Sequence, residues 1–91
     1  MPFPVEHNAT RGRFEARVDG KLCVADYQLS DGVMHMTHTF VPPEVGGRGV
    51  AAALVRNALA YARAHDLRVN PACSYVRSYM RRHPETQSLQ A

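Results

Sequence analysis

The sequence changes character at one glycine-rich stretch, residues 44–51, which reads Glu44-Val45-Gly46-Gly47-Arg48-Gly49-Val50-Ala51. Before this stretch, apolar and polar residues alternate as they do in a half-buried strand. After it, apolar residues recur at every third or fourth position, as on one face of a helix. The stretch therefore joins a β half to a helical half, and this order predicts an α+β fold with helices packed on a sheet.

An antiparallel meander is predicted before residue 44. Two Asp-Gly pairs, Asp19-Gly20 and Asp31-Gly32, fit two-residue hairpin turns because glycine adopts a positive φ at little cost. The predicted strands cover residues 3–7, 13–18, 21–29 and 33–41. Two prolines weaken the first of these, which is expected at the edge of the sheet. On the last strand, Met34, Met36 and His38 alternate onto one face.

Two helices and one more strand are predicted after residue 48. A helix over 49–65 carries an apolar residue at every fourth position, namely Val50, Leu54, Ala58 and Ala62. Residues 67–69 form a short strand, and residues 74–82 form a second helix that ends before Pro84. The order is β-β-β-β-α-β-α, a meander followed by α-β-α. We expect one domain over residues 1–91, with a core at about 13–85 and a loosely held tail at 85–91.

Length and composition limit the class of protein. A chain of 91 residues fits one domain. No run of about 18 apolar residues is present, so no membrane span is expected. The first residues lack the basic and apolar regions of a secretory signal. Cys23 and Cys73 are expected to be thiols, which fits a cytoplasmic location.

Positive charge is concentrated in the second half of the chain. Residues 46–91 hold seven arginines and two carboxylates, a net charge of +5. Such an excess can attract a nucleic acid or a phosphorylated cofactor, and it also occurs on solvated helix surfaces. No aromatic residues interleave with the arginines as they do on a nucleic-acid-binding surface, which disfavours an oligonucleotide partner.

The glycine-rich stretch has the composition of an anion-binding loop. Glycines between a strand and a helix remove Cβ atoms, so backbone N–H groups can converge on an anion at the positive end of the helix. Arg48 can add a charge-assisted contact. The stretch lacks the Gly-Lys-Ser/Thr ending of a nucleotide-hydrolysing loop and the third glycine of the dinucleotide fingerprint. It favours pyrophosphate binding, with a purely structural turn as the alternative.

Residues 44–51 also resemble motif A of the GCN5-related N-acetyltransferases, which reads Gln/Arg-x-x-Gly-x-Gly/Ala. The chain is similar to the minimal single-domain members of that family, the YjdJ-like and NATD1-like proteins, over roughly residues 13–85. The shared positions are His38-Thr39-x-Val41-Pro42, Gly47-Arg48-Gly49-Val50-Ala51-x-x-Leu54, Pro71-x-Cys73-x-Tyr75, Tyr79 and His83-Pro84-Glu85. Glu44 and Gly46 depart from the pattern, because polar or basic residues usually stand at these positions.

The resemblance implies a GCN5-like domain that binds acetyl-coenzyme A and transfers acetyl to an amine, either a small molecule or a protein lysine. It implies that Thr39, Phe40 and Val41 pair with pantetheine. It further implies that the pyrophosphate is bound by Gly46, Gly47, Arg48, Gly49, Val50 and Ala51. Larger members insert paired helices that help to form the acceptor site, and this chain lacks them. We therefore expect an open acceptor side, on a monomer or a weak dimer.

Three side chains are candidates for catalysis, and each has a structural alternative. Cys73, just before the second helix, is either a nucleophile or a small buried residue. His38 is either a general base or a core residue on the face of Met34. The resemblance implies Tyr75 as a proton donor to the leaving thiolate, whereas its spacing from Tyr79 also fits one packed helix face.

No metal site is predicted, because His35 and His38 fall on opposite faces of a regular strand and the two cysteines lack metal-ligand spacing. One other class of function stays open. The domain could hold coenzyme A, another anion or a nucleic acid without catalysing a reaction.

Overall fold

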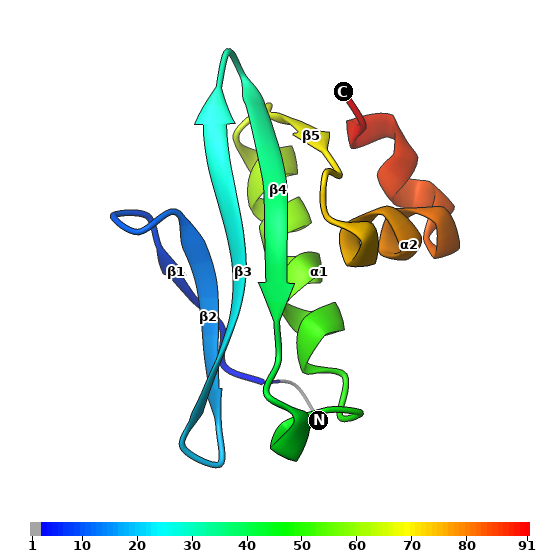
Figure 1. The fold of residues 1–91 in the computed structure, drawn as a ribbon. Helices are drawn as coiled ribbons and strands as arrows, with labels where there is room; N and C mark the ends of the chain where they lie inside the picture. The colour runs from blue at the N-terminus through cyan, green and yellow to red at the C-terminus, as the bar shows by residue number, and fades with distance from the viewer. Residues whose placement is uncertain (1–2) are drawn as a thin grey trace.

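The structure is a computed structural model that describes residues 3–91, and it contains one five-stranded sheet with two helices (Figure 1). The strands are β1 (Glu6–Asn8), β2 (Arg13–Val18), β3 (Lys21–Ser30), β4 (Val33–Phe40) and β5 (Arg68–Asn70). The helices are α1 (Val50–Ala64) and α2 (Ser74–Arg82), with 3-10 turns η1 (Pro43–Val45) and η2 (Pro84–Leu89). The predicted order β-β-β-β-α-β-α is therefore confirmed.

The two Asp-Gly turns form as predicted and fix the register of the meander. Asp19 and Gly20 have φ values of 52° and 75°, and Asp31 and Gly32 have values of 53° and 76°. Two successive residues with positive φ match the right-handed twist of the strands that they connect. Strands β1 to β4 consequently lie side by side in chain order, each antiparallel to the next.

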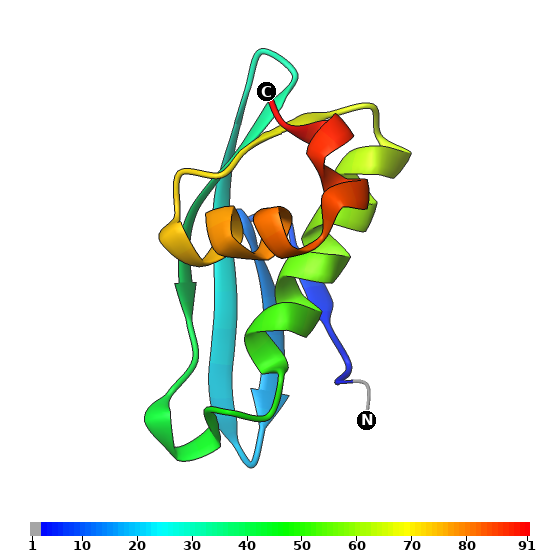
Figure 2. The ribbon, with the colours of Figure 1, turned by 90° about the vertical axis from the view of Figure 1, so that its right-hand side faces the viewer.

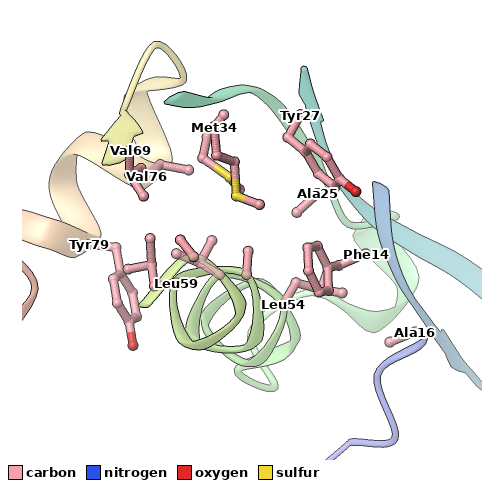
Figure 3. Close-up of a cluster of buried hydrophobic side chains, with 14 of the residues drawn as sticks. Phe14, Ala16, Ala25, Tyr27, Met34, Leu54, Leu59, Val69, Val76 and Tyr79 are labelled. Atoms are coloured by element: carbon pink, nitrogen blue, oxygen red, sulfur yellow. The ribbon is translucent and has the colours of Figure 1, made fainter. Parts of the chain in front are cut away.

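Helix α1 covers one face of this sheet, and α2 packs beside it at the β5 edge (Figure 2). The apolar stripe of α1 is buried against the strands, and Figure 3 shows Leu54 and Leu59 directed toward Phe14, Met34 and Tyr79. Among residues 3–91 no helix lies on the other face, which is turned toward the viewer in Figure 1. In the same range, neither helix is long and apolar enough to cross a membrane.

Strands β4 and β5 are parallel but pair over three residues only. Val33, Met34 and His35 lie opposite Arg68–Asn70. The chain then leaves β4, and the last bond on this side is donated by the Cys73 N–H to the Met36 carbonyl at 2.8 Å. Within residues 3–91, the rest of β4 has no strand partner on that side, so its backbone is accessible at the end nearest the glycine loop.

A bulge in β4 corrects two predictions about the histidines. Met36 lies opposite Tyr27 and His38 lies opposite Asp26, so Thr37 is an extra residue in β4. The extra residue reverses the alternation, and His38 faces away from α1 and is exposed. The predicted core position beside Met34 is therefore wrong. His35 lies opposite Gln28, on the same face as His38, so the predicted opposite faces are also wrong.

The C-terminal segment is packed, whereas a loose tail was predicted. Residues 84–89 form η2, in which Thr86 and Leu89 are buried. The Ala91 N–H donates to the Val69 carbonyl at 2.8 Å, and Arg68 Nη2 donates to the Gln90 carbonyl at 2.9 Å. The tail therefore extends the β5 edge of the sheet, and its low apolar content concealed this packing from the sequence pattern.

Candidate functional site

The glycine loop leaves several backbone donors without a partner at the start of α1. Gly47 and Gly49 have φ values of 78° and 83°, and Gly49 is the N-cap of α1. A Cβ at either glycine would meet no atom within 4 Å, so the positive φ, not crowding, requires glycine here. The first three N–H groups of α1 have no acceptor within the helix. Open space and unpaired donors thus coincide at the positive end of the helix.

A pocket of about 240 Å³ opens at this loop. Its lining comes from the end of β4, the loop, the first turn of α1 and the start of α2: Val41, Gly46, Gly47, Gly49, Val50, Ala51, Ala52 and Tyr75. The tertiary structure therefore brings together most of the residues that the sequence assigned to cofactor binding. Thr39 and Phe40 precede the pocket on the free edge of β4, where Phe40 is 48% exposed.

Two ion pairs connect the loop to the β2–β3 turn. Arg48 Nη1 lies 2.8 Å from Asp19 Oδ2, and Lys21 Nζ lies 3.9 Å from Glu44 Oε2. All four side chains are largely exposed, so each pair adds little stability. The Glu44 carboxylate, which departs from motif A, is directed at Lys21. Its negative charge is partly offset there.

Cys73 lies beside β4 at the N-cap of α2. Its Sγ is 3.5 Å from the Thr39 hydroxyl oxygen. Burial raises the pKa of the thiol, but the Thr39 hydroxyl and the N–H groups of Val76, Tyr75 and Thr39 favour the thiolate and hold the pKa below its usual value. The Cys73 side chain forms no capping hydrogen bond to α2. The arrangement fits a thiol that ionises readily, as thiols at helix N-termini do.

The two tyrosines of α2 differ in exposure. Tyr79 is buried in the core, with its ring stacked on His83 at a centroid distance of 4.1 Å. Tyr75 is half-buried and lines the loop pocket. Burial raises the pKa of Tyr75, and the opposing effect of Arg82 is smaller. Tyr75 is therefore protonated at neutral pH, as a proton donor must be.

His38 is separated from this group by the sheet itself. Thr39 faces α1 and contacts Cys73, whereas His38 faces the helix-free side. Asp26 lies directly opposite His38 on β3, and Asp26 Oδ1 accepts from Arg13 Nε at 3.1 Å. The sequence pattern gave no reason to single out Asp26, because only the bulge places it beside His38. Among residues 3–91, no group of three or more histidine, cysteine and carboxylate side chains could hold a metal ion.

The chain matches the family model of the GCN5-related N-acetyltransferases over residues 13–89. It belongs to this family. Protein NATD1 of Homo sapiens and Protein NATD1 of Gallus gallus are each 30% identical to it over 93 residues. Each match covers 98% of this chain, and it covers 81% of the Homo sapiens protein and 84% of the Gallus gallus protein. The NMR solution structure of a GCN5-like protein from Staphylococcus aureus has a TM-score of 0.77 at 22% identity, covering 98% of this chain and 88% of that chain.

Family membership and fold thus agree with the expectation drawn from residues 44–51. In this GCN5-related domain, the motif A loop, the free edge of β4 and Cys73 all lie at the diverging end of β4 and β5. The family is one of acetyltransferases.

Proposed function

We propose that the domain binds acetyl-coenzyme A and transfers its acetyl group to an amine. One observation carries the proposal: the glycine-loop pocket and the Thr39–Cys73 contact lie at the same end of the gap beside β4. A phosphate-binding loop alone would suit many ligands. A thiol and a free strand edge next to it suit a ligand that has a pyrophosphate, an amide-rich arm and a thioester.

The residues present fit this ligand. The N–H groups of residues 47–51 can donate to a pyrophosphate, whereas the Gly46 N–H already donates to the Pro43 carbonyl at 3.2 Å. No Cβ at Gly47 or Gly49 obstructs the approach of the ligand. Arg48 is 47% exposed and can exchange Asp19 for a phosphate oxygen, since an exposed ion pair is weak. The backbone of Thr39, Phe40 and Val41 can pair with the amides of pantetheine, as an added strand pairs with an open sheet edge.

Two routes of transfer are open, and they depend on different side chains: His38 and Tyr75 in one, and Cys73 in the other. The bound thioester supplies an acetyl group that a nucleophile can take. In the direct route, His38 accepts a proton from the acceptor amine, which attacks the carbonyl, and Tyr75 gives its proton to the departing thiolate. In the covalent route, the Cys73 thiolate forms a bond to the acetyl carbon as the bond to coenzyme A sulfur breaks. The amine then attacks the acetyl carbon of the acetyl-Cys73 thioester, and the carbon–sulfur bond breaks to release Cys73 as the thiolate. The proton lost by the amine passes to solvent.

The helix-free face of the sheet is where we expect the acceptor to approach. His38 lies on this face, next to the edge of β4 that Thr39 and Cys73 reach from the other side. No helix among residues 3–91 covers the approach. The other candidate function is a module that holds coenzyme A without catalysis, and an acceptor-library assay of thiol release separates the two.

Cofactor binding is tested by Gly47→Ala with Gly32→Ala as its matched control. Both glycines have φ near +77°, and a Cβ at either would meet no atom within 4 Å, so the two changes strain the backbone equally. We expect both to lower the free energy of unfolding by about 1–2 kcal/mol. Only Gly47→Ala should weaken acetyl-coenzyme A binding in calorimetric titration, by about tenfold, which is ~1.4 kcal/mol.

Equal affinity in the two variants would count against the loop as the pyrophosphate site. Saturable binding of oligonucleotides instead of acetyl-coenzyme A, weakening steeply as salt is added, would overturn the proposal as a whole.

A further inference from the structure

A second and larger pocket, of about 300 Å³, lies between α1 and the segment formed by α2 and η2. Its lining includes Arg56 and Arg63 of α1, Tyr79 of α2 and His83. Figure 3 shows Tyr79 beside Leu59 with its hydroxyl directed away from the sheet, toward this side of the molecule. The pocket is thus bordered by two guanidinium groups and by a stacked aromatic pair.

The spacing of the lining residues connects this pocket to the loop pocket. On α1, Ala52 lines the loop pocket, and Arg56, Ala60 and Arg63 follow at intervals of three or four residues. On α2 and its C-cap, Tyr75 lines the loop pocket, and Tyr79 and His83 follow at intervals of four. Residues at these intervals lie on one face of a helix. Both pockets therefore lie along one stripe of α1 and one stripe of α2.

The charges of the second pocket favour an anion. Arg56 is exposed and has no ion-pair partner among residues 3–91. Arg63 Nη2 donates to the Glu85 backbone carbonyl at 3.1 Å and keeps its remaining donors. The Glu85 carboxylate also lines the pocket, where its Oε2 lies 3.5 Å from His83 Nδ1, and among residues 3–91 it forms no ion pair with either arginine. Two arginines in one groove suit the oxygens of a phosphomonoester.

We propose that Arg56, with Arg63 behind it, binds the 3′-phosphate of the same coenzyme A molecule, and that Tyr79 and His83 border its adenine. This inference rests on the proposed function. Ala51 and Arg56 are five residues apart on α1, about 7.5 Å along the helix axis. A ribose and its phosphoester bonds span a distance of this order. Pyrophosphate at the first turn thus leaves the 3′-phosphate within reach of the Arg56 side chain.

The experiment removes the phosphate from the ligand and the charge from the protein in turn. Coenzyme A and 3′-dephospho-coenzyme A are titrated calorimetrically into the wild-type chain and into Arg56→Gln. Arg17→Gln is the matched control, because Arg17 is exposed on β2, away from this groove. We expect the wild type to bind coenzyme A about tenfold more tightly than the dephospho form, as befits charge-assisted bonds. Arg56→Gln should lose most of this difference and should leave 3′-dephospho-coenzyme A affinity unchanged.

The outcomes separate this inference from the proposed function. Equal binding of the two ligands by the wild type would overturn the 3′-phosphate site and leave the cofactor loop standing. A preference that persists in Arg56→Gln would overturn the role of Arg56. Binding of neither ligand would overturn the site together with the proposed function.

Discussion

Cys73 shows how a single residue acquires its chemistry from its surroundings. Partial burial of the thiol disfavours the charged thiolate. The Thr39 hydroxyl and nearby N–H groups of α2 favour the thiolate. The second set of effects prevails, and the pKa is lowered. Cys23 has the opposite environment, because it is fully buried and burial raises its pKa. Two thiols in one small domain are thus expected to differ in reactivity.

We predict that iodoacetamide modifies Cys73 faster than Cys23 and at lower pH. The thiolate is the reactive form, so the rate at Cys73 should rise with pH and level off at a midpoint below the ordinary thiol value of 9.0. Mass spectrometry of the wild type and of Cys73→Ala over a pH series measures this. A midpoint at or above 9.0 would show that burial dominates at Cys73.

The same variant distinguishes the two routes of transfer. If Cys73→Ala transfers acetyl at the wild-type rate to an accepted amine, the covalent route is excluded and direct attack remains.

Among the helices, strands and turns, η2 differs most from what the sequence predicted. It closes the end of the core with Leu89, which is 8% exposed, and the two residues after it, Gln90 and Ala91, bond to β5. It also completes the basic groove, since Glu85, Thr86 and Leu89 line the pocket of Arg56. A segment expected to be loose thus supports both the core and one wall of a proposed binding site.

Leu89→Ala should lower the free energy of unfolding by about 2 kcal/mol, as truncation of a buried leucine does. Leu29→Ala is the control, because the same side chain at that position is 53% exposed and should change stability by less than about 0.5 kcal/mol. Urea unfolding of both variants measures the difference. Equal effects would mean that the tail does not contribute to the core in solution.

The whole molecule is a two-layer domain with one face of its sheet uncovered by helices among residues 3–91. Its core holds an aromatic cluster that ties β1 to α1. His7 stacks on Phe14 at 4.2 Å, meets Tyr61 at 4.4 Å and hydrogen-bonds to the Tyr27 hydroxyl. Burial, with a smaller effect of His65, lowers the pKa of His7 below 6.5. Protonation of this one ring therefore opposes the packing of the edge strand.

Global stability should consequently fall as the pH falls from about 7.5 to about 5.5. Near pH 6.5 the unfolded chain binds a proton at His7 that the folded protein does not, so the free energy of unfolding rises with pH across this window. His7→Phe keeps the stacking and cannot be protonated, so its stability should depend less on pH. Thermal unfolding at several pH values measures both, and parallel curves would exclude His7 as the cause.

Much of the fold could be predicted from local patterns. The Asp-Gly turns, the alternation in β2 and the four-residue repeat of α1 each depend on neighbours in the chain, and all three are confirmed. The family could be recognised from an ordered set of short motifs between His38 and Glu85, of which the glycines at 47 and 49 are one part. The site residues at these positions stay predictions until a ligand is bound.

What the sequence by itself determined is therefore the order of the elements, the position of the glycine-rich loop and the family. Only the tertiary structure decided where His38 points, because the bulge at Thr37 is set by pairing with β3 and not by the local sequence. The same holds for the Thr39–Cys73 contact, the packing of η2 and the groove of Arg56. Each joins residues distant in the chain, and contacts of that kind depend on how strands and helices pack against one another.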